Sequence, residues 1–172
     1  MNRYWHRREH MYRGTNYELP RWIRLYGENS ANLDNNNTDI FNGVNWTIAS
    51  AGSGDQLRIR GHVNITAILK TTGGQPAFVD FELLRLALLV VGDDVDTSDR
   101  SIYNETNAQV VRRIRNMGVG GYPVTMRTKI PNVVLRPDHD LIAVLYSPSE
   151  LNASREMGTI TWFEGWRQEV TD

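Results

Sequence analysis

The 172-residue sequence contains no cysteine, which excludes disulfide bonds, thiolate nucleophiles and thiolate-bound zinc together. It also lacks long apolar runs. The run "LALLVV", from Leu86 to Val91, is far shorter than the roughly 20 residues that span a bilayer. The net charge is only −1, so bulk charge predicts neither nucleic-acid binding nor a salt-adapted acidic surface. What remains is the ordinary composition of a globular protein, 40% hydrophobic and 23% charged.

Lysine is scarce, with 2 residues against 17 arginines. Several arginines lie in residues 1–20, where they alternate with aromatic residues. Residues 27–39, "GENSANLDNNNTD", are too polar to pack a core and are expected to form a linker. We therefore predict an N-terminal arm and polar linker over residues 1–39 and one domain over residues 40–172. Arginine with aromatics suits docking on a neighbouring subunit, or contact with nucleic acid or lipid head groups. The candidate contact residues are Arg3, Tyr4, Trp5, Arg7, Arg8, Tyr12, Arg13 and Trp22.

The stretch "LRIRGHVNITAIL", residues 57–69, has the clearest pattern of the chain. Apolar and polar residues alternate along it, as in a strand with one face in a core. Its expected core residues are Leu57, Ile59, Val63, Ile65 and Leu69. Arg58, Arg60, His62 and Asn64 fall on the opposite face. Such a strand is stable only when a second sheet covers its apolar side.

Other segments repeat this pattern between Gly, Pro, Asn and Asp turns, and "AFVDFELLRLALLVV" is expected to be a strand buried on both faces. The segment "NETNAQVVRRIRNMG" instead predicts a short helix, with Val110 and Ile114 facing inward and Gly118 ending it. Ile160, Trp162 and Trp166 share one parity and are expected in the core. The sum is an all-β fold of about eight antiparallel strands, a β-sandwich or barrel, with one short inserted helix.

Candidate chemistry is weak. "HRREH", His6 to His10, matches the spelling of a zinc-peptidase motif but has no apolar periodicity to hold a helix. His139 lies between two aspartates and is better explained as a turn residue than as a metal ligand. The acidic stretch "GDDVDTSD" lacks the order of a calcium-binding loop. We expect no catalytic residue, no metal site and no cofactor, and hence a protein that is not an enzyme.

The architecture resembles the single-jelly-roll capsid proteins of viruses. The resemblance is carried by Gly54 and Asp55, the alternating strand 57–69, and the apolar run 83–91 that ends at Asp93 and Asp94. Length and near-neutral charge are most similar to the small major capsid protein of sphaerolipovirus-type, membrane-containing icosahedral phages of thermophilic bacteria. Capsid proteins of satellite-necrosis-type plant viruses are the other near match, although their arms are more densely basic.

The resemblance implies a jelly roll that builds an icosahedral shell over an internal membrane, assembled in the host cytoplasm and located in the virion. The implied partners are a second copy of the chain, as a homodimer, a second major capsid protein, and viral membrane lipids. Nucleic-acid contact stays open, and no small-molecule substrate is implied. The alternative is a carbohydrate-binding, lectin-like β-sandwich that uses Trp46, Trp162 and Trp166 as a sugar platform.

Overall fold

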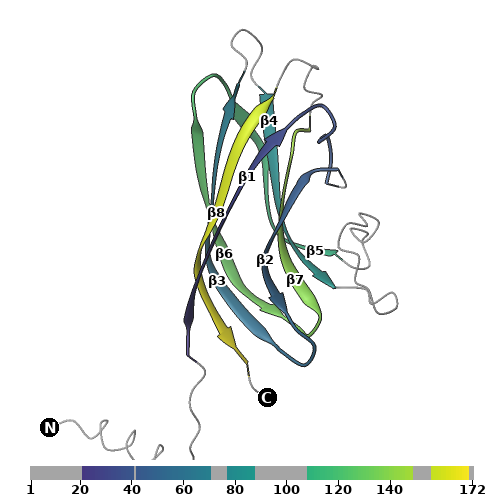
Figure 1. Cartoon of the computed structure of the whole chain (residues 1–172), viewed down its shortest axis with the longest axis vertical. Coiled ribbons are helices and arrows are strands. Elements are labelled where there is room, and N and C mark those ends of the chain that lie inside the picture. The colour runs from purple at the N-terminus through teal and green to yellow at the C-terminus, as the bar shows by residue number, and fades with distance from the viewer. Residues whose placement is uncertain (1–20, 41, 71–76, 88–107, 149–155, 171–172) are drawn as a thin grey trace, which may run out of the picture.

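The computed structural model describes residues 21–40, 42–70, 77–87, 108–148 and 156–170. These residues form eight strands in two four-stranded antiparallel sheets (Figure 1). The strands are β1 (Ile23–Leu33), β2 (Val44–Ala51), β3 (Leu57–Leu69), β4 (Ala77–Ala87), β5 (Ala108–Val119), β6 (Val124–Leu135), β7 (His139–Tyr146) and β8 (Met157–Glu169). No helix of the described residues is long and apolar enough to cross a membrane.

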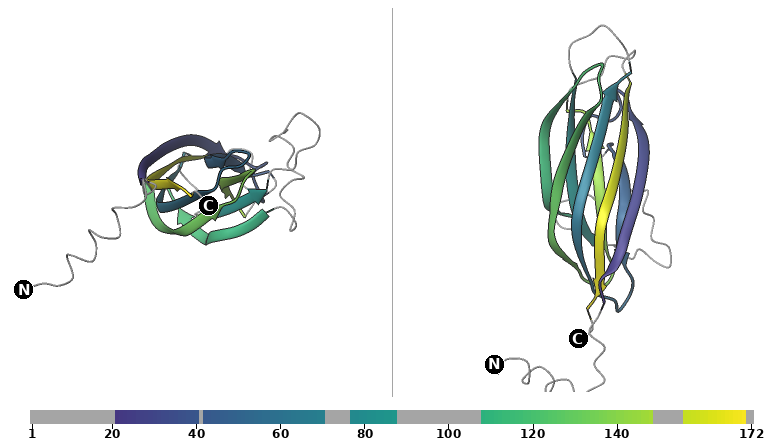
Figure 2. Two further views of the ribbon diagram at one scale, coloured as in Figure 1. Left: turned by 90° about the horizontal axis from the view of Figure 1, so that it is seen from below. Right: turned by 90° about the vertical axis from the view of Figure 1, so that its left-hand side faces the viewer.

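One sheet has the order β1-β8-β3-β6 and the other β2-β7-β4-β5. Successive strands of the chain therefore lie in opposite sheets, except for the pair β4 and β5. The sandwich is elongated along its strands, and Figure 2 shows the first sheet face-on. β1 begins and β8 ends side by side at one end of the molecule, where Ile23 pairs with Arg167.

The core lies between the sheets and follows from the alternation in β3. Leu57, Ile59, Val63, Ile65 and Leu69 are each at most 4% exposed and belong to this core. Phe163 of β8 and Phe81 of β4 are its largest fully buried side chains. Burial of side chains of this size contributes about 1.5–3 kcal/mol each before the entropy of folding is subtracted. The sandwich is therefore held mainly by its interior.

β4 is buried on both faces, as its sequence predicts. Ala77, Val79, Phe81 and Leu83 enter the core, while Leu84 and Leu86 face outward. There they pack with residues of β7 in a second, smaller apolar cluster that consists of Leu84, Leu86, Ile142, Val144 and Tyr146, flanked by Ile40 and Ala108. The outward side of this sheet therefore has a small apolar cluster that is separate from the core between the sheets.

The expected linker is wrong over residues 27–33, which form the second half of β1. β1 pairs with β8 from Ile23 to Leu33 without a register shift. Polar composition misled the prediction because an edge strand needs backbone partners on only one side and few inward side chains. Gly27 supplies one inward position: an added Cβ would lie 2.7 Å from the Trp46 ring, so the glycine makes room for that indole.

The expected helix is wrong from Ala108 onward, since this segment is β5; residues 104–107 lie outside the described residues. β5 has two register shifts against β4. Each adds a residue, so the inward positions Val111, Ile114 and Met117 recur every third residue. Bulges therefore gave a strand the apparent period of a helix.

β6 continues through Pro131. Its register against β3 shifts between Ile59 and Gly61, opposite Pro131. A proline cannot donate to the ladder, but it is tolerated at a bulge of an edge strand. β6 is such an edge.

Candidate interaction site

The outer surface of the sheet β1-β8-β3-β6 carries rows of charged and aromatic side chains set by the strand register. Arg24, Trp166 and Arg60 lie opposite one another on β1, β8 and β3. In the next row, Glu164 lies beside His62, which pairs with Lys129 of β6. We call this surface the basic face; its residues are Arg24, Arg60, His62, Arg127, Lys129, Glu164 and Trp166.

The basic face is hollowed by a depression of about 470 Å³ that all seven residues line. Four of them are arginine or lysine and one is a carboxylate. That carboxylate, Glu164, forms an ion pair with Arg127 at 2.9 Å. Within the described residues neither Arg24 nor Lys129 has an ion-pair partner. With neutral histidine the lining has a net charge of +3, against −1 for the whole chain.

Trp22 connects the predicted arm to this face. The guanidinium carbon of Arg60 lies 4.0 Å from the centroid of the Trp22 ring, which is a cation–π contact. The other predicted arm contacts, from Arg3 to Arg13, lie outside the described residues. Trp22 is therefore the arm residue whose environment the structure describes.

The backbone beneath the depression contains a close glycine pair. Gly61 of β3 lies opposite Gly165 of β8, and both line the depression. An added Cβ on Gly165 would lie 2.2 Å from the Arg60 carbonyl oxygen and 2.7 Å from the Phe163 ring. Two strands approach this closely only where both lack side chains.

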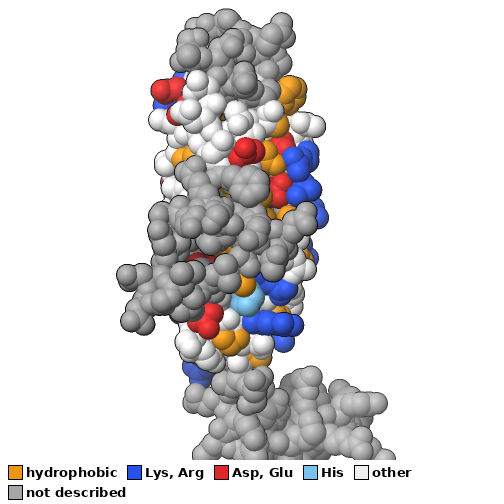
Figure 3. Space-filling view, turned by 90° about the vertical axis from the view of Figure 1, so that its right-hand side faces the viewer, with side chains coloured by type: hydrophobic (Ala, Val, Ile, Leu, Met, Phe, Trp, Pro, Cys, Tyr) orange, Lys and Arg blue, Asp and Glu red, His pale blue; other side chains and the backbone are white. Residues whose placement is uncertain are grey.

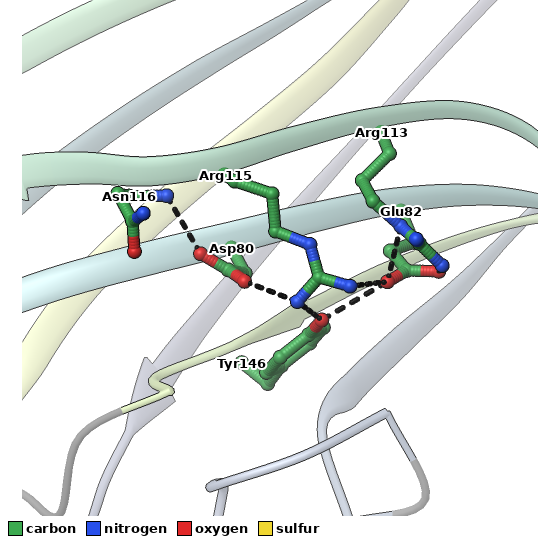
Figure 4. A network of polar contacts seen from close by, with 6 residues as sticks. All are labelled: Asp80, Glu82, Arg113, Arg115, Asn116 and Tyr146. Atoms are coloured by element: carbon green, nitrogen blue, oxygen red, sulfur yellow. Dashed lines mark hydrogen bonds and ion pairs between the residues drawn. The ribbon is translucent and has the colours of Figure 1, made fainter.

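The outer surface of the second sheet carries its charges differently (Figure 4). Asp80 and Glu82 of β4 are each 1% exposed. Arg115 contacts the Asp80 carboxylate at 2.8 Å and the Glu82 carboxylate at 3.2 Å, and Arg113 contacts Glu82 at 2.8 Å. The Tyr146 hydroxyl donates to Glu82 at 3.0 Å. We call these five residues the paired cluster.

A bulge in β5 builds the paired cluster. The register skips Asp80, which faces Arg115 and Asn116. Asn116 has a φ of 55°, a left-handed conformation that asparagine tolerates. Its backbone N–H donates a hydrogen bond to the Asp80 carboxylate at 2.8 Å. The shift lets Arg113 and Arg115 reach the same carboxylate, Glu82. Figure 3, which views this side of the molecule, shows lysine and arginine side chains gathered along one margin beside acidic ones.

The environment of the paired cluster changes its proton affinities. Burial, followed by the hydrogen bond to Glu82, raises the pKa of Tyr146. The hydrogen bond to Asp80 raises the pKa of Arg115. Both groups therefore keep their protons in the physiological range. The cluster is saturated with hydrogen bonds and ion pairs, which suits a structural role rather than proton transfer.

Asp140 of β7 lies on the same surface but has no such pairing. It is 4% exposed, and its Oδ1 has no hydrogen-bond partner among the described residues. Burial raises the pKa of this carboxyl, while a hydrogen bond with Ser50 and the nearby His139 act in the opposite direction.

The predicted local hydrogen bond of His139 is confirmed, since its Nδ1 lies 2.8 Å from the Pro137 carbonyl oxygen. The residue itself is not in the turn but begins β7, directly after it. The described residues contain no group of three or more potential metal ligands. His6 to His10 and the acidic stretch from Gly92 lie outside them.

The placement of Ile160, Trp162 and Trp166 in the core is wrong. Ile160 and Trp166 are 43% and 45% exposed on the outer surface, and Trp162 is half-buried there. The inward parity of β8 is instead Met157, Thr159, Thr161 and Phe163. The prediction chose the wrong face of β8 because two of its four inward residues are threonines, whereas the outward face carries Ile160, Trp162 and Trp166. Trp46 is half-buried against the core and is not an exposed platform.

No protein-family model and no curated protein sequence matches the chain. Among solved structures it is similar to an aminopeptidase from a marine sediment Thaumarchaeota archaeon (10% identity, TM-score 0.43, 90% of this chain), of whose length it spans 35%. It is also similar to the CBM22-1 xylan-binding domain from Paenibacillus barcinonensis (14%, 0.34, 88% of this chain and 86% of that one). A third is the decameric BFDV capsid protein (9%, 0.34, 88% and 99%). At these values the likenesses assign neither a family nor a function.

Proposed function

We propose that the chain is a viral capsid protein whose described domain is a single jelly roll. The observation that carries the proposal is the strand order, β1-β8-β3-β6 against β2-β7-β4-β5. Two interleaved Greek keys give such an eight-stranded double sheet, which is typical of viral capsid proteins, lectins and cupins. Elongated, rigid walls with charged outer surfaces on both sheets favour the first of these, because a shell is built by surfaces rather than by a reactive pocket.

In this proposal the protein is structural and not catalytic. It resides in the virion after assembly in the host cytoplasm, and it associates with copies of itself as a dimer and with a second major capsid protein above a lipid membrane. The arm, residues 1–20, supports contacts between subunits. The sphaerolipovirus type is the specific form of the proposal, motivated by length and near-neutral charge.

Imaging of the purified full chain, alone and mixed with membrane vesicles, tests this function. We expect regular oligomers or shells from the full chain. Deletion of residues 1–20 should keep the β-sheet circular dichroism spectrum and abolish regular assembly. A full chain that stays monomeric under all these conditions contradicts the capsid proposal, and unchanged assembly after deletion contradicts the role of the arm.

A carbohydrate-binding module is the second candidate, favoured by one observation. Trp166 is 45% exposed beside the depression of the basic face. An exposed indole on a sheet surface can stack on a sugar ring. Binding on a glycan array that is lost in Trp166→Ala, together with an absence of assembly, would favour this candidate over the capsid protein.

A further inference from the structure

We propose that the basic face is a binding site for a phosphate group. The inference does not depend on the capsid proposal, because it rests on the local arrangement of charges. Arg24, Arg60, Arg127 and Lys129 come from β1, β3 and β6 and converge on one depression. Cations that line one hollow repel one another, and a bound anion offsets that repulsion.

Within the described residues, the charges of the basic face are only partly neutralised. Glu164 is the carboxylate of the depression, and it is paired with Arg127. Arg60 is held over Trp22, a contact that orients its guanidinium without cancelling its charge. On the other sheet, by contrast, Asp80 and Glu82 form ion pairs with Arg115 and Arg113. In the part of the chain that the structure describes, Arg113 and Arg115 are thus paired with buried carboxylates, whereas Arg24 and Lys129 of the basic face have no ion-pair partner.

The shape of the site suits a small oxyanion. Arginine presents forked donors that match phosphate geometry, and lysine adds a point charge. The glycine pair forms part of the floor of the depression. The side-chain positions that it leaves empty lie on the core side, against the Phe163 ring, and let β3 and β8 approach each other. Trp166 forms an apolar wall on one side of the depression. The chemistry is shared by free phosphate compounds and by phospholipid head groups.

Inorganic pyrophosphate is the probe for the first experiment, because Trp166 and Trp22 at the site report binding through their fluorescence. The full chain is titrated in about 0.15 M NaCl, where diffuse attraction is screened beyond about 8 Å. We expect saturable quenching that Lys129→Gln weakens about tenfold, the loss expected for one charged contact. Arg136→Gln is the matched control, since it removes one charge from an exposed residue between β6 and β7, outside the depression. Its affinity should equal that of the wild type.

Vesicles identify the source of the phosphate. Phosphatidylglycerol vesicles that displace pyrophosphate, while phosphatidylcholine vesicles do not, assign the site to anionic phospholipid; displacement by neither assigns it to free phosphate compounds. An absence of pyrophosphate binding overturns the proposal. Equal weakening by Lys129→Gln and Arg136→Gln also overturns it, because attraction to overall charge would then suffice. Unfolding curves of both variants exclude misfolding as the cause of any loss.

Discussion

Both outer surfaces of this sandwich carry arginines and carboxylates, but the two surfaces arrange them differently. In the paired cluster, two buried carboxylates are saturated by two arginines, a tyrosine hydroxyl and a backbone amide. On the basic face, four cations line a hollow with one carboxylate, and both members of its ion pair are at least 40% exposed. Saturated charges hold strands together, and unsaturated charges are available to a ligand. Whether a charged side chain is buried and paired with an opposite charge therefore says more about its role than its residue type does.

The largest expected effect lies in the paired cluster. Glu82→Ala removes the acceptor of Arg113, Arg115 and Tyr146. We expect a loss of about 3 kcal/mol in the free energy of unfolding, near the low end for breaking a buried pair, because both arginines can still reach water. Urea unfolding followed by circular dichroism measures it.

Glu164→Ala is the matched control for this prediction, since it removes the same side chain from the exposed ion pair with Arg127. Its cost should stay below about 1 kcal/mol. Equal costs for the two glutamates would erase the distinction between the surfaces.

A backbone contact, not a charge, should matter next. Gly165→Ala places a methyl group 2.2 Å from the Arg60 carbonyl oxygen, so β3 and β8 must separate. We expect a loss of about 2 kcal/mol, as for other overpacked sites, together with weaker pyrophosphate binding. Denaturant unfolding and the fluorescence titration measure the two effects.

Gly121→Ala serves as the comparison, because an added Cβ there meets nothing within 4 Å. A wild-type stability of Gly165→Ala would mean that the glycine pair does not shape the basic face.

The smallest effect is expected at Asp140, a buried carboxyl whose Oδ1 has no hydrogen-bond partner among the described residues. Its pKa is raised by burial. A raised folded-state pKa contributes stability below the ordinary carboxyl pKa of about 3.9, and this stability is lost as the pH rises through the raised value. Asp140→Asn should therefore equal the wild type at acidic pH and be more stable by about 1 kcal/mol at pH 7.

Thermal or urea unfolding between pH 3 and pH 7 tests this sign. Asp138→Asn removes the same charge two residues away, at a half-buried position whose φ of 57° asparagine tolerates. A pH-independent gain in Asp140→Asn would show that the charge of this carboxyl is not the cause.

The sequence predicts the sandwich well where apolar residues alternate strictly. β3 and β4 lie where the pattern puts them, because burial of one or both faces dictates the residue types. β5 could not be predicted in the same way, since its bulges shift the inward residues to every third position. β1 was missed in part because its stability comes from backbone pairing with β8, which leaves little trace in the side chains.

The candidate site could be predicted only in fragments. The outward parity of Arg60 and His62 is visible in the sequence, and Arg127 and Lys129 alternate in the same manner on another strand. Their meeting depends on the pairing of β3 with β6 and of β3 with β8, contacts between segments about 70 to 100 residues apart. No local pattern encodes such a pairing.

The unshifted register of β1 and β8 defines two distinct ends of the sandwich. The chain enters the sandwich at Ile23 and leaves it near Arg167, which are paired neighbours, whereas Leu69 and Met157 pair at the far end of β3 and β8. A dye attached at Ile23 or Arg167 therefore lies at one pole, and an insertion after Leu69 or just before Met157 emerges from the opposite pole. Two labels placed in this way would report which pole of the molecule faces any surface to which it attaches.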